Sequence, residues 1–259
     1  MKAVLAALLA LSAGAAEFSE TLNGVPYRAV LSEDAVKIYA TLKGKPYVVF
    51  FHPGAAETPR LEESLTQKRF PDFFKDGSRA LVYRMVNTPL GRSTLFVARY
   101  QKGRFARAGA FPEGRLVDLD EDGRWEIVTE SSPLGRALTV ACPRFSTTVM
   151  AAAKTDIMSW RGGKFVSVAA RFPKFFEQRI SDGQAKLSAI GPSNLDLSGE
   201  YVGRALTLYY DYAALGRGRA GWSELSSLVA PKSSLPGVAD CAAQIKADLR
   251  AKLSIPADW

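Results

Sequence analysis

Cysteine and histidine are nearly absent from this chain. Its 259 residues include two cysteines and a single histidine, His52. A zinc site needs several Cys or His ligands, and the His-Glu-x-x-His motif of metalloproteases needs two histidines. The Gly-x-Ser-x-Gly motif of α/β-hydrolases is missing as well. The sequence therefore assembles no catalytic constellation, and His52, which follows the apolar run 47–51, is interpreted as a structural residue.

Long apolar runs are also missing, with one exception at the N-terminus. Lys2 precedes the apolar run 3–11, and small residues follow at 12–16. This order predicts a cleavable signal peptide over residues 1–16 and a mature chain that starts near Glu17. The run is too short to cross a bilayer, which takes about 20 residues. We therefore expect an exported protein, periplasmic or secreted, without a membrane span.

Runs of basic residues are absent too, although the chain is basic, with a formal net charge of +8. Its lysines and arginines are scattered singly, unlike the clusters of nucleic-acid-binding arms. This pattern argues against a nucleic-acid partner. A basic exported surface suits an anionic envelope polymer or a protein, and an ordinary solvated surface is the alternative.

The two cysteines, Cys142 and Cys241, are predicted to form one disulfide, because exported proteins meet an oxidising environment. Such a bond would close a loop of about 100 residues and restrict the unfolded chain. The alternative is a pair of buried thiols.

Short alternating apolar segments dominate residues 17–176 and predict a β-rich domain. The pairs Lys43-Gly44, Lys102-Gly103 and Gly162-Gly163 are typical of tight hairpin turns. Apolar residues at helical spacing then predict helices over 201–215 and 238–253, with a shorter one over 223–229. The expected fold class is α+β: antiparallel, partly propeller-like sheets over 17–176, with a helical segment, 177–259, packed on them.

A weak internal repeat adds to this expectation. Residues 100–112 and 160–173 share an aromatic residue, a glycine turn, a basic residue, a phenylalanine and a closing Phe-Pro. Repeated units of this size occur as blades of β-propellers. Chance similarity between two hairpins is the alternative.

The most informative segment is an acidic loop at 118–126. It places acidic side chains at loop positions 1, 3, 5 and 9, and Gly123 supplies a sharp turn. Calcium binds six to eight oxygens, which such spacing can gather around one point. An EF-hand also needs an acidic residue at position 12, where this chain has Thr129, and its flanks are helices, whereas 116–117 and 126–128 read as strands. The sequence therefore predicts a calcium loop of another kind. An acidic turn that binds no metal is the alternative.

This strand–loop–strand segment resembles the calcium loops of FG-GAP and VCBS-type repeats, which are propeller blades common in cell-surface and exported proteins. The resemblance covers one loop, with Glu121 standing where those repeats often carry glycine. It implies four side-chain ligands and one backbone carbonyl around a structural Ca²⁺. By position, these ligands are Asp118, Asp120, Asp122, Glu126 and the carbonyl of Arg124.

Three functions follow as hypotheses. The first is a non-enzymatic binding or structural protein with one calcium-stabilised loop, which fits the lack of catalytic motifs. The second is a hydrolase of envelope or extracellular polymers that uses scattered acids such as Glu57 and Glu62. The third is a polyanion-binding module, which would require one basic face formed by Arg99, Arg104, Arg107 and Arg115.

Overall fold

The computed structural model describes residues 16–62, 65, 69–135, 137–142, 145–150, 152–190, 199–229 and 236–259. The predicted signal peptide lies outside these residues except for Ala16. The chain divides into two compact units. The first unit ends at Gly114 and also takes in Gly123–Trp125, and the second comprises Arg115–Asp122 and Glu126–Trp259.

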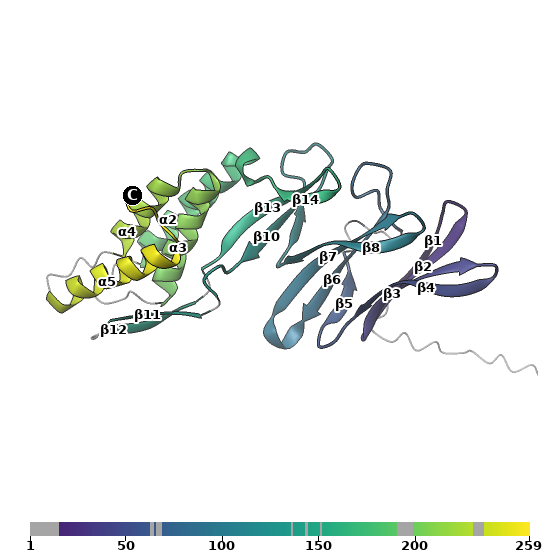
Figure 1. Cartoon of the computed structure of the whole chain (residues 1–259), viewed down its shortest axis with the longest axis horizontal. Coiled ribbons are helices and arrows are strands. Elements are labelled where there is room, and N and C mark those ends of the chain that lie inside the picture. Colours follow the sequence, from purple (N-terminus) through teal and green to yellow (C-terminus); the bar gives the residue numbers. More distant parts are fainter. Residues whose placement is uncertain are drawn as a thin grey trace, which may run out of the picture. The chain divides into compact units, whose positions relative to one another are not determined.

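Two four-stranded antiparallel sheets form the first unit (Figure 1). In each sheet every strand pairs with the strand next to it in the chain. The first sheet contains β1 (Ala16–Leu22), β2 (Val25–Ser32), β3 (Ala35–Leu42) and β4 (Lys45–Pro53). The second contains β5 (Thr58–Leu61), β6 (Ala80–Asn87), β7 (Arg92–Gln101) and β8 (Arg104–Pro112), with a short 3₁₀ helix, η1 (Thr88–Leu90), between β6 and β7.

The predicted hairpin turns are present at tight two-residue loops. Leu42 pairs with Lys45, so Lys43 and Gly44 alone form the turn, and both have positive φ, 50° and 74°. Lys102-Gly103 repeats this geometry, with φ of 51° and 82°. Two positive φ angles define the turn whose twist matches a hairpin, and glycine adopts them without steric cost.

The core of the first unit lies between its two sheets. Alternate residues of β2 and β3, such as Leu31 and Ile38, belong to the same buried cluster as residues of β6, such as Leu81 and Met85. All four of these side chains are fully buried. This period of two is the physical basis of the alternation in the sequence, because successive side chains of a strand point to opposite faces.

The second unit combines a third sheet with helices. The sheet has the order β14-β13-β10-β9, and the β11–β12 hairpin is inserted between β10 and β13. Its strands are β9 (Arg115–Val117), β10 (Glu126–Ser131), β13 (Lys154–Arg161) and β14 (Lys164–Ser167), and the hairpin consists of β11 (Ala137–Cys142) and β12 (Phe145–Met150). A 3₁₀ helix, η2 (Ala169–Arg171), leads into α2 (Pro173–Ile190), α3 (Gly199–Ala214), α4 (Gly218–Leu228) and α5 (Pro236–Lys252).

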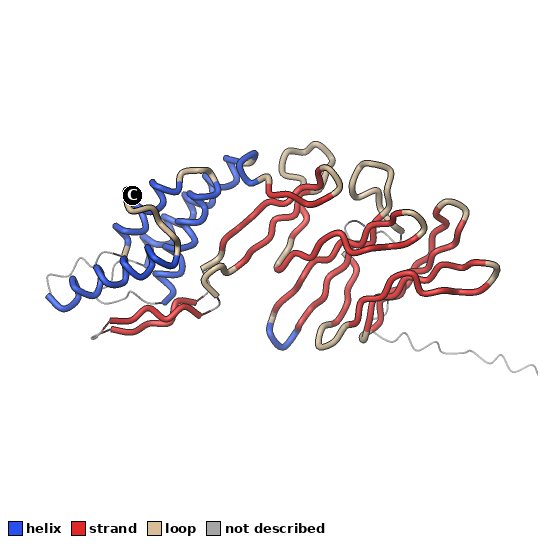
Figure 2. The backbone as a smooth tube through the Cα atoms, viewed as in Figure 1, coloured by secondary structure: helices blue, strands red, loops and turns tan. Residues whose placement is uncertain are grey.

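These helices pack on one another and beside the hairpin (Figure 2). Leu206, Trp222 and Leu249, one from each of α3, α4 and α5, share a buried cluster. The start of α4 lies close to α3, since a Cβ on Gly221 would stand 2.7 Å from the Cβ of Tyr212. Glycine is therefore required at this helix crossing. None of the described helices is long and apolar enough to cross a membrane.

The expected α+β class is confirmed at this level: antiparallel sheets are followed by helices in the C-terminal part. Helices were expected over 201–215 and 238–253, and α3 and α5 occupy these positions, while α4 is longer than the expected 223–229. Helix α2 was missed, although Pro173 marks its start and Phe176, Ile180 and Leu187 are buried. The change to helix falls at α2, whereas the second compact unit also includes the third sheet.

Candidate metal site

The acidic loop joins the first two strands of the third sheet. Val117 at the end of β9 pairs with Glu126 at the start of β10, so residues 118–125 form the connection. Both flanks are strands, which excludes an EF-hand, as the sequence predicts. Glu121 and Gly123 have φ of 58° and 77°. These left-handed residues turn the loop sharply, and Glu121 adopts the conformation that glycine favours at this position.

The base of the loop is anchored in the core of the second unit. Val117 and Leu119 pack against a cluster that includes the buried side chains of Val128, Ile157 and Phe176. Leu119 lies between Asp118 and Asp120 in the chain, so its packing holds the start of the acidic loop against this cluster. Strand pairing and core packing thus hold both ends of the loop without the help of a ligand.

Three of the predicted ligands converge. One carboxylate oxygen from each of Asp118, Asp120 and Glu126 lies within 4.8 Å of the other two. Calcium–oxygen bonds measure about 2.3–2.6 Å, so two oxygens on one ion are at most about 5 Å apart. The spacing therefore permits all three oxygens to bind the same hard cation. Three carboxylates are also the donor type that calcium prefers.

Glu126 is the buried member of this group, with 2% of its surface exposed. Burial is the main cause that raises the pKa of its carboxyl group. A hydrogen bond from the Leu119 N–H, 3.2 Å from Oε2, opposes the rise, while the charges of Asp120, Asp122 and Asp118 add to it. Burial and the neighbouring negative charges thus make the ionised form of Glu126 energetically unfavourable. A bound cation would offset both the burial and the repulsion.

The two remaining predicted ligands, Asp122 and the carbonyl of Arg124, are not among the three converging groups. Asp122 lies outside the converging group, although its charge acts on Glu126. The carbonyl of Arg124 stays a prediction. A further residue that the sequence did not indicate, Arg171 of η2, places Nη2 3.7 Å from Oδ2 of Asp120. Both side chains of this pair are partly exposed, so it contributes at most about 1 kcal/mol.

The predicted disulfide falls on residues whose side chains lie outside the description. Cys142 ends β11 and Cys241 lies within α5. The backbone places α5 beside β11, as a bond between the two elements requires. The Cys142–Cys241 disulfide stays a prediction.

His52 has the surroundings of a structural residue. Its Nδ1 lies 2.8 Å from the hydroxyl of Tyr83, which is fully buried, and its ring packs edge-on against Phe96 at 4.6 Å. Burial, and next the charge of Arg107, lower the pKa of the imidazole. The neutral ring therefore packs at the edge of the hydrophobic core of the first unit.

The basic and acidic residues of the other two hypotheses are dispersed. In the β7–β8 pairing Arg99 faces Ala106, so Arg99 and Arg104 share one face of the sheet and Arg107 lies on the other. Arg99 is also engaged, with Nη2 2.8 Å from Oδ2 of Asp76. The sheet register therefore does not gather these arginines into one basic face.

Glu62, an acid considered for hydrolysis, accepts from Nε of Arg84 at 2.7 Å. This ion pair crosses from the end of β5 to β6 and is largely shielded from water. It joins neighbouring parts of the second sheet, which is a structural role.

Comparison with known proteins gives no relatives: no family model, no curated protein and no solved structure matches this chain.

Proposed function

We propose that this chain is an exported, non-enzymatic binding or structural protein whose β9–β10 loop is stabilised by one calcium ion. The observation that carries the proposal is the convergence of Asp118, Asp120 and Glu126 within 4.8 Å. Asp122 and the carbonyl of Arg124 complete the ligand set, with water. The predicted export signal supports the calcium part, because extracellular calcium modules have dissociation constants of about 10⁻⁴–10⁻³ M.

The role of the ion is structural. It would connect Asp118, just after β9, to Glu126, the first residue of β10, and so close the loop at its base. It would also neutralise a buried carboxylate that otherwise destabilises the folded chain.

We further propose that the three four-stranded sheets are blade-like units of the FG-GAP or VCBS type. Each follows chain order, apart from the β11–β12 insertion in the third. The internal repeat supports this, because its two copies are the last hairpins of the second and third sheets. Tyr100 pairs with Phe105 in one hairpin, and Trp160 pairs with Phe165 in the other.

Isothermal titration calorimetry of the purified protein with calcium tests the proposal. We expect one site per chain with a dissociation constant in the range of about 10⁻⁴–10⁻³ M. The matched variants are Asp118→Asn, which removes a converging oxygen charge, and Glu121→Gln, which removes a charge from the same loop outside the converging group. Binding that is lost only in Asp118→Asn supports the site. The absence of heat and of any thermal shift at millimolar calcium would refute it.

A further inference from the structure

The second unit contains a cleft that borders the acidic loop, because Arg171 in its lining places Nη2 3.7 Å from Oδ2 of Asp120. It is formed by β13, the segment from the end of β14 through η2, and the C-terminal end of α3. Its volume is about 450 Å³, which falls in the range of pockets that hold small organic ligands.

Cations outnumber acids around this cleft. Lys154, Arg161 and Arg171 line it, against one carboxylate, Asp156. Neither Lys154 nor Arg161 forms an ion pair with another described residue. Arg171 is paired with Asp120, so the charge of the cleft left without a partner in the described part of this unit is that of Lys154 and Arg161.

The single acid is already engaged as an acceptor. Oδ1 of Asp156 accepts from the Ser167 hydroxyl at 2.6 Å and from the Ile157 N–H at 2.8 Å. These bonds hold the carboxylate against β13 and β14. Asp156 thus connects β13 to β14 in the wall of the cleft. It does not form an ion pair with the described cations of the cleft, which can therefore bind an anionic ligand.

A buried hydroxyl lies within the wall of the cleft. Thr155 lines the cleft and is 2% exposed, and its Oγ1 has no hydrogen-bond partner among the described residues. A buried polar atom without a partner is costly, so such atoms are rare in folded proteins. This oxygen has no surface open to the cleft, so a ligand there would not reach it.

Small side chains keep the cleft open. Ala169 and Ala170 of η2 face it together with Ala213 and Ala214 of α3. Each ends at Cβ, so a larger residue at these positions would occupy the volume.

We propose that this cleft binds a small organic anion, with its phosphate or carboxylate group on the cations and its body over the alanines. Arg161 contacts the anionic group, and Lys154, at the other end of β13, adds to the positive potential of the cleft. The cations of the cleft do not require a bound calcium ion, although Arg171 connects the cleft to Asp120 of the acidic loop.

Calorimetric titration of the full protein tests the cleft, with glucose 6-phosphate, inorganic phosphate and uncharged glucose as probes. Each titration is run in calcium and in chelator, so that failure of the calcium site and failure of the cleft are distinguishable. We expect glucose 6-phosphate to bind and glucose not to bind. Binding of inorganic phosphate as tightly as of the sugar phosphate also supports an anion site and assigns the affinity to the phosphate group.

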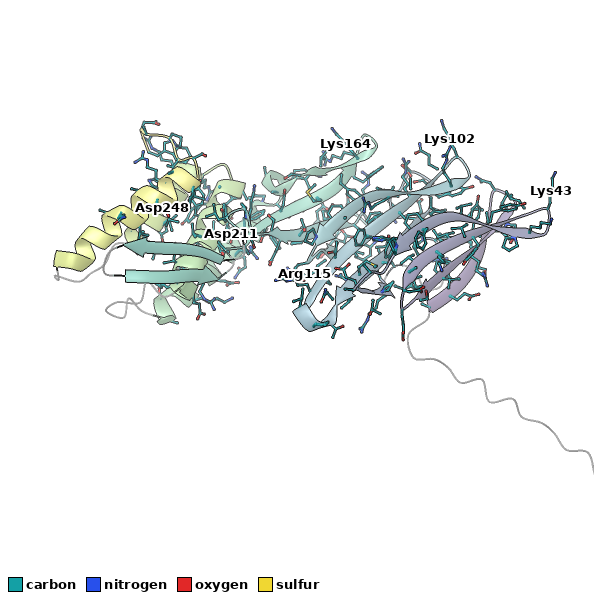
Figure 3. All side chains as sticks on the ribbon, turned by 60° about the horizontal axis from the view of Figure 1, so that its bottom comes forward. Lys43, Lys102, Arg115, Lys164, Asp211 and Asp248 are labelled. Carbon is teal, nitrogen blue, oxygen red and sulfur yellow. The ribbon has the colours of Figure 1, made fainter. Side chains whose placement is uncertain are left out.

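Three variants locate the site. Arg161→Gln should weaken glucose 6-phosphate binding about 10-fold or more, as expected for a charged hydrogen-bond donor. Ala213→Leu should block binding while keeping every charge, and Ala213 is exposed, so the protein should tolerate leucine. The matched control is Lys164→Gln, because Lys164 lies at the tip of the β13–β14 hairpin (Figure 3) and does not line the cleft.

The proposal is overturned if neither anion binds at millimolar concentration, or if glucose binds as tightly as glucose 6-phosphate. Equal weakening by Lys164→Gln and Arg161→Gln would also overturn it, because diffuse surface charge would then explain the affinity. Circular dichroism of each variant confirms that it is folded before its binding is compared.

Discussion

Replacing Glu126 by glutamine should stabilise the protein without calcium and remove most of the stabilisation that calcium gives. The buried carboxylate lies within 4.8 Å of oxygens of Asp118 and Asp120. Glu126→Gln removes the charge and keeps an oxygen for the Leu119 N–H. Without a cation the variant therefore loses repulsion and burial cost but keeps its hydrogen bond.

The magnitude follows from the separation of the charges. At 4.8 Å, two unit charges repel by about 3.5 kcal/mol at an effective dielectric constant of about 20 and by about 0.9 kcal/mol in water. Asp120 has 34% of its side chain exposed. Its repulsion with Glu126 is therefore screened by water and lies closer to the lower value. A gain of about 1–3 kcal/mol raises the melting temperature by about 2–4 °C per kcal/mol for a domain of this size.

Calcium should cancel most of this advantage. At calcium concentrations of about 10 to 100 times the dissociation constant, wild type gains about 1.4–2.7 kcal/mol. The variant lacks one converging carboxylate and should gain little. Differential scanning fluorimetry in chelator and at about 10 mM calcium measures both shifts for wild type, Glu126→Gln and the control Glu121→Gln.

The pH dependence gives an independent check with a definite sign. The folded pKa of Glu126 is raised, so the folded state binds this proton more tightly than the unfolded state. In chelator, that contribution to wild-type stability is full below the ordinary value of 4.5 and is lost as pH rises through the raised pKa. The advantage of Glu126→Gln over wild type should accordingly be small near pH 4 and grow toward pH 7. A variant that is less stable than wild type in chelator at pH 7, or one that keeps the wild-type calcium shift, would refute the reasoning.

Three further predictions concern export, cross-linking and packing. The N-terminus of the exported protein, read by mass spectrometry, should start at or next to Glu17; an intact first residue would contradict the signal peptide. Cys142→Ser should abolish a reduction-dependent mobility shift on a denaturing gel and expose Cys241 to thiol reagents, whereas free thiols in the wild-type protein would count against the disulfide. Gly221→Ala should lower the free energy of unfolding by about 1–3 kcal/mol in urea titrations, because its Cβ would meet Tyr212; an unchanged midpoint would show that the helix crossing yields.

Elements set by neighbouring residues were predictable from the sequence. The turns at Lys43-Gly44 and Lys102-Gly103 depend on the φ angles of two adjacent residues, and both turns are present. The amphipathic helices α3 and α5 carry a regular apolar spacing, which local periodicity reveals. Helix α2 was missed because polar residues and Gly183 interrupt its apolar stripe.

The sequence by itself determined that the acidic loop lies between two strands, because the spacing of its acids and the alternation of its flanks are local properties. Only the tertiary structure decided which acids meet: Asp118, Asp120 and Glu126 converge, and Asp122 stays outside. The tertiary structure also decided that β13 pairs with β10 across the inserted hairpin, and that Arg161 and Ala213 line one cleft. These pairings join residues far apart in the chain. They depend on burial and packing between elements, which leave no repeating pattern in the sequence.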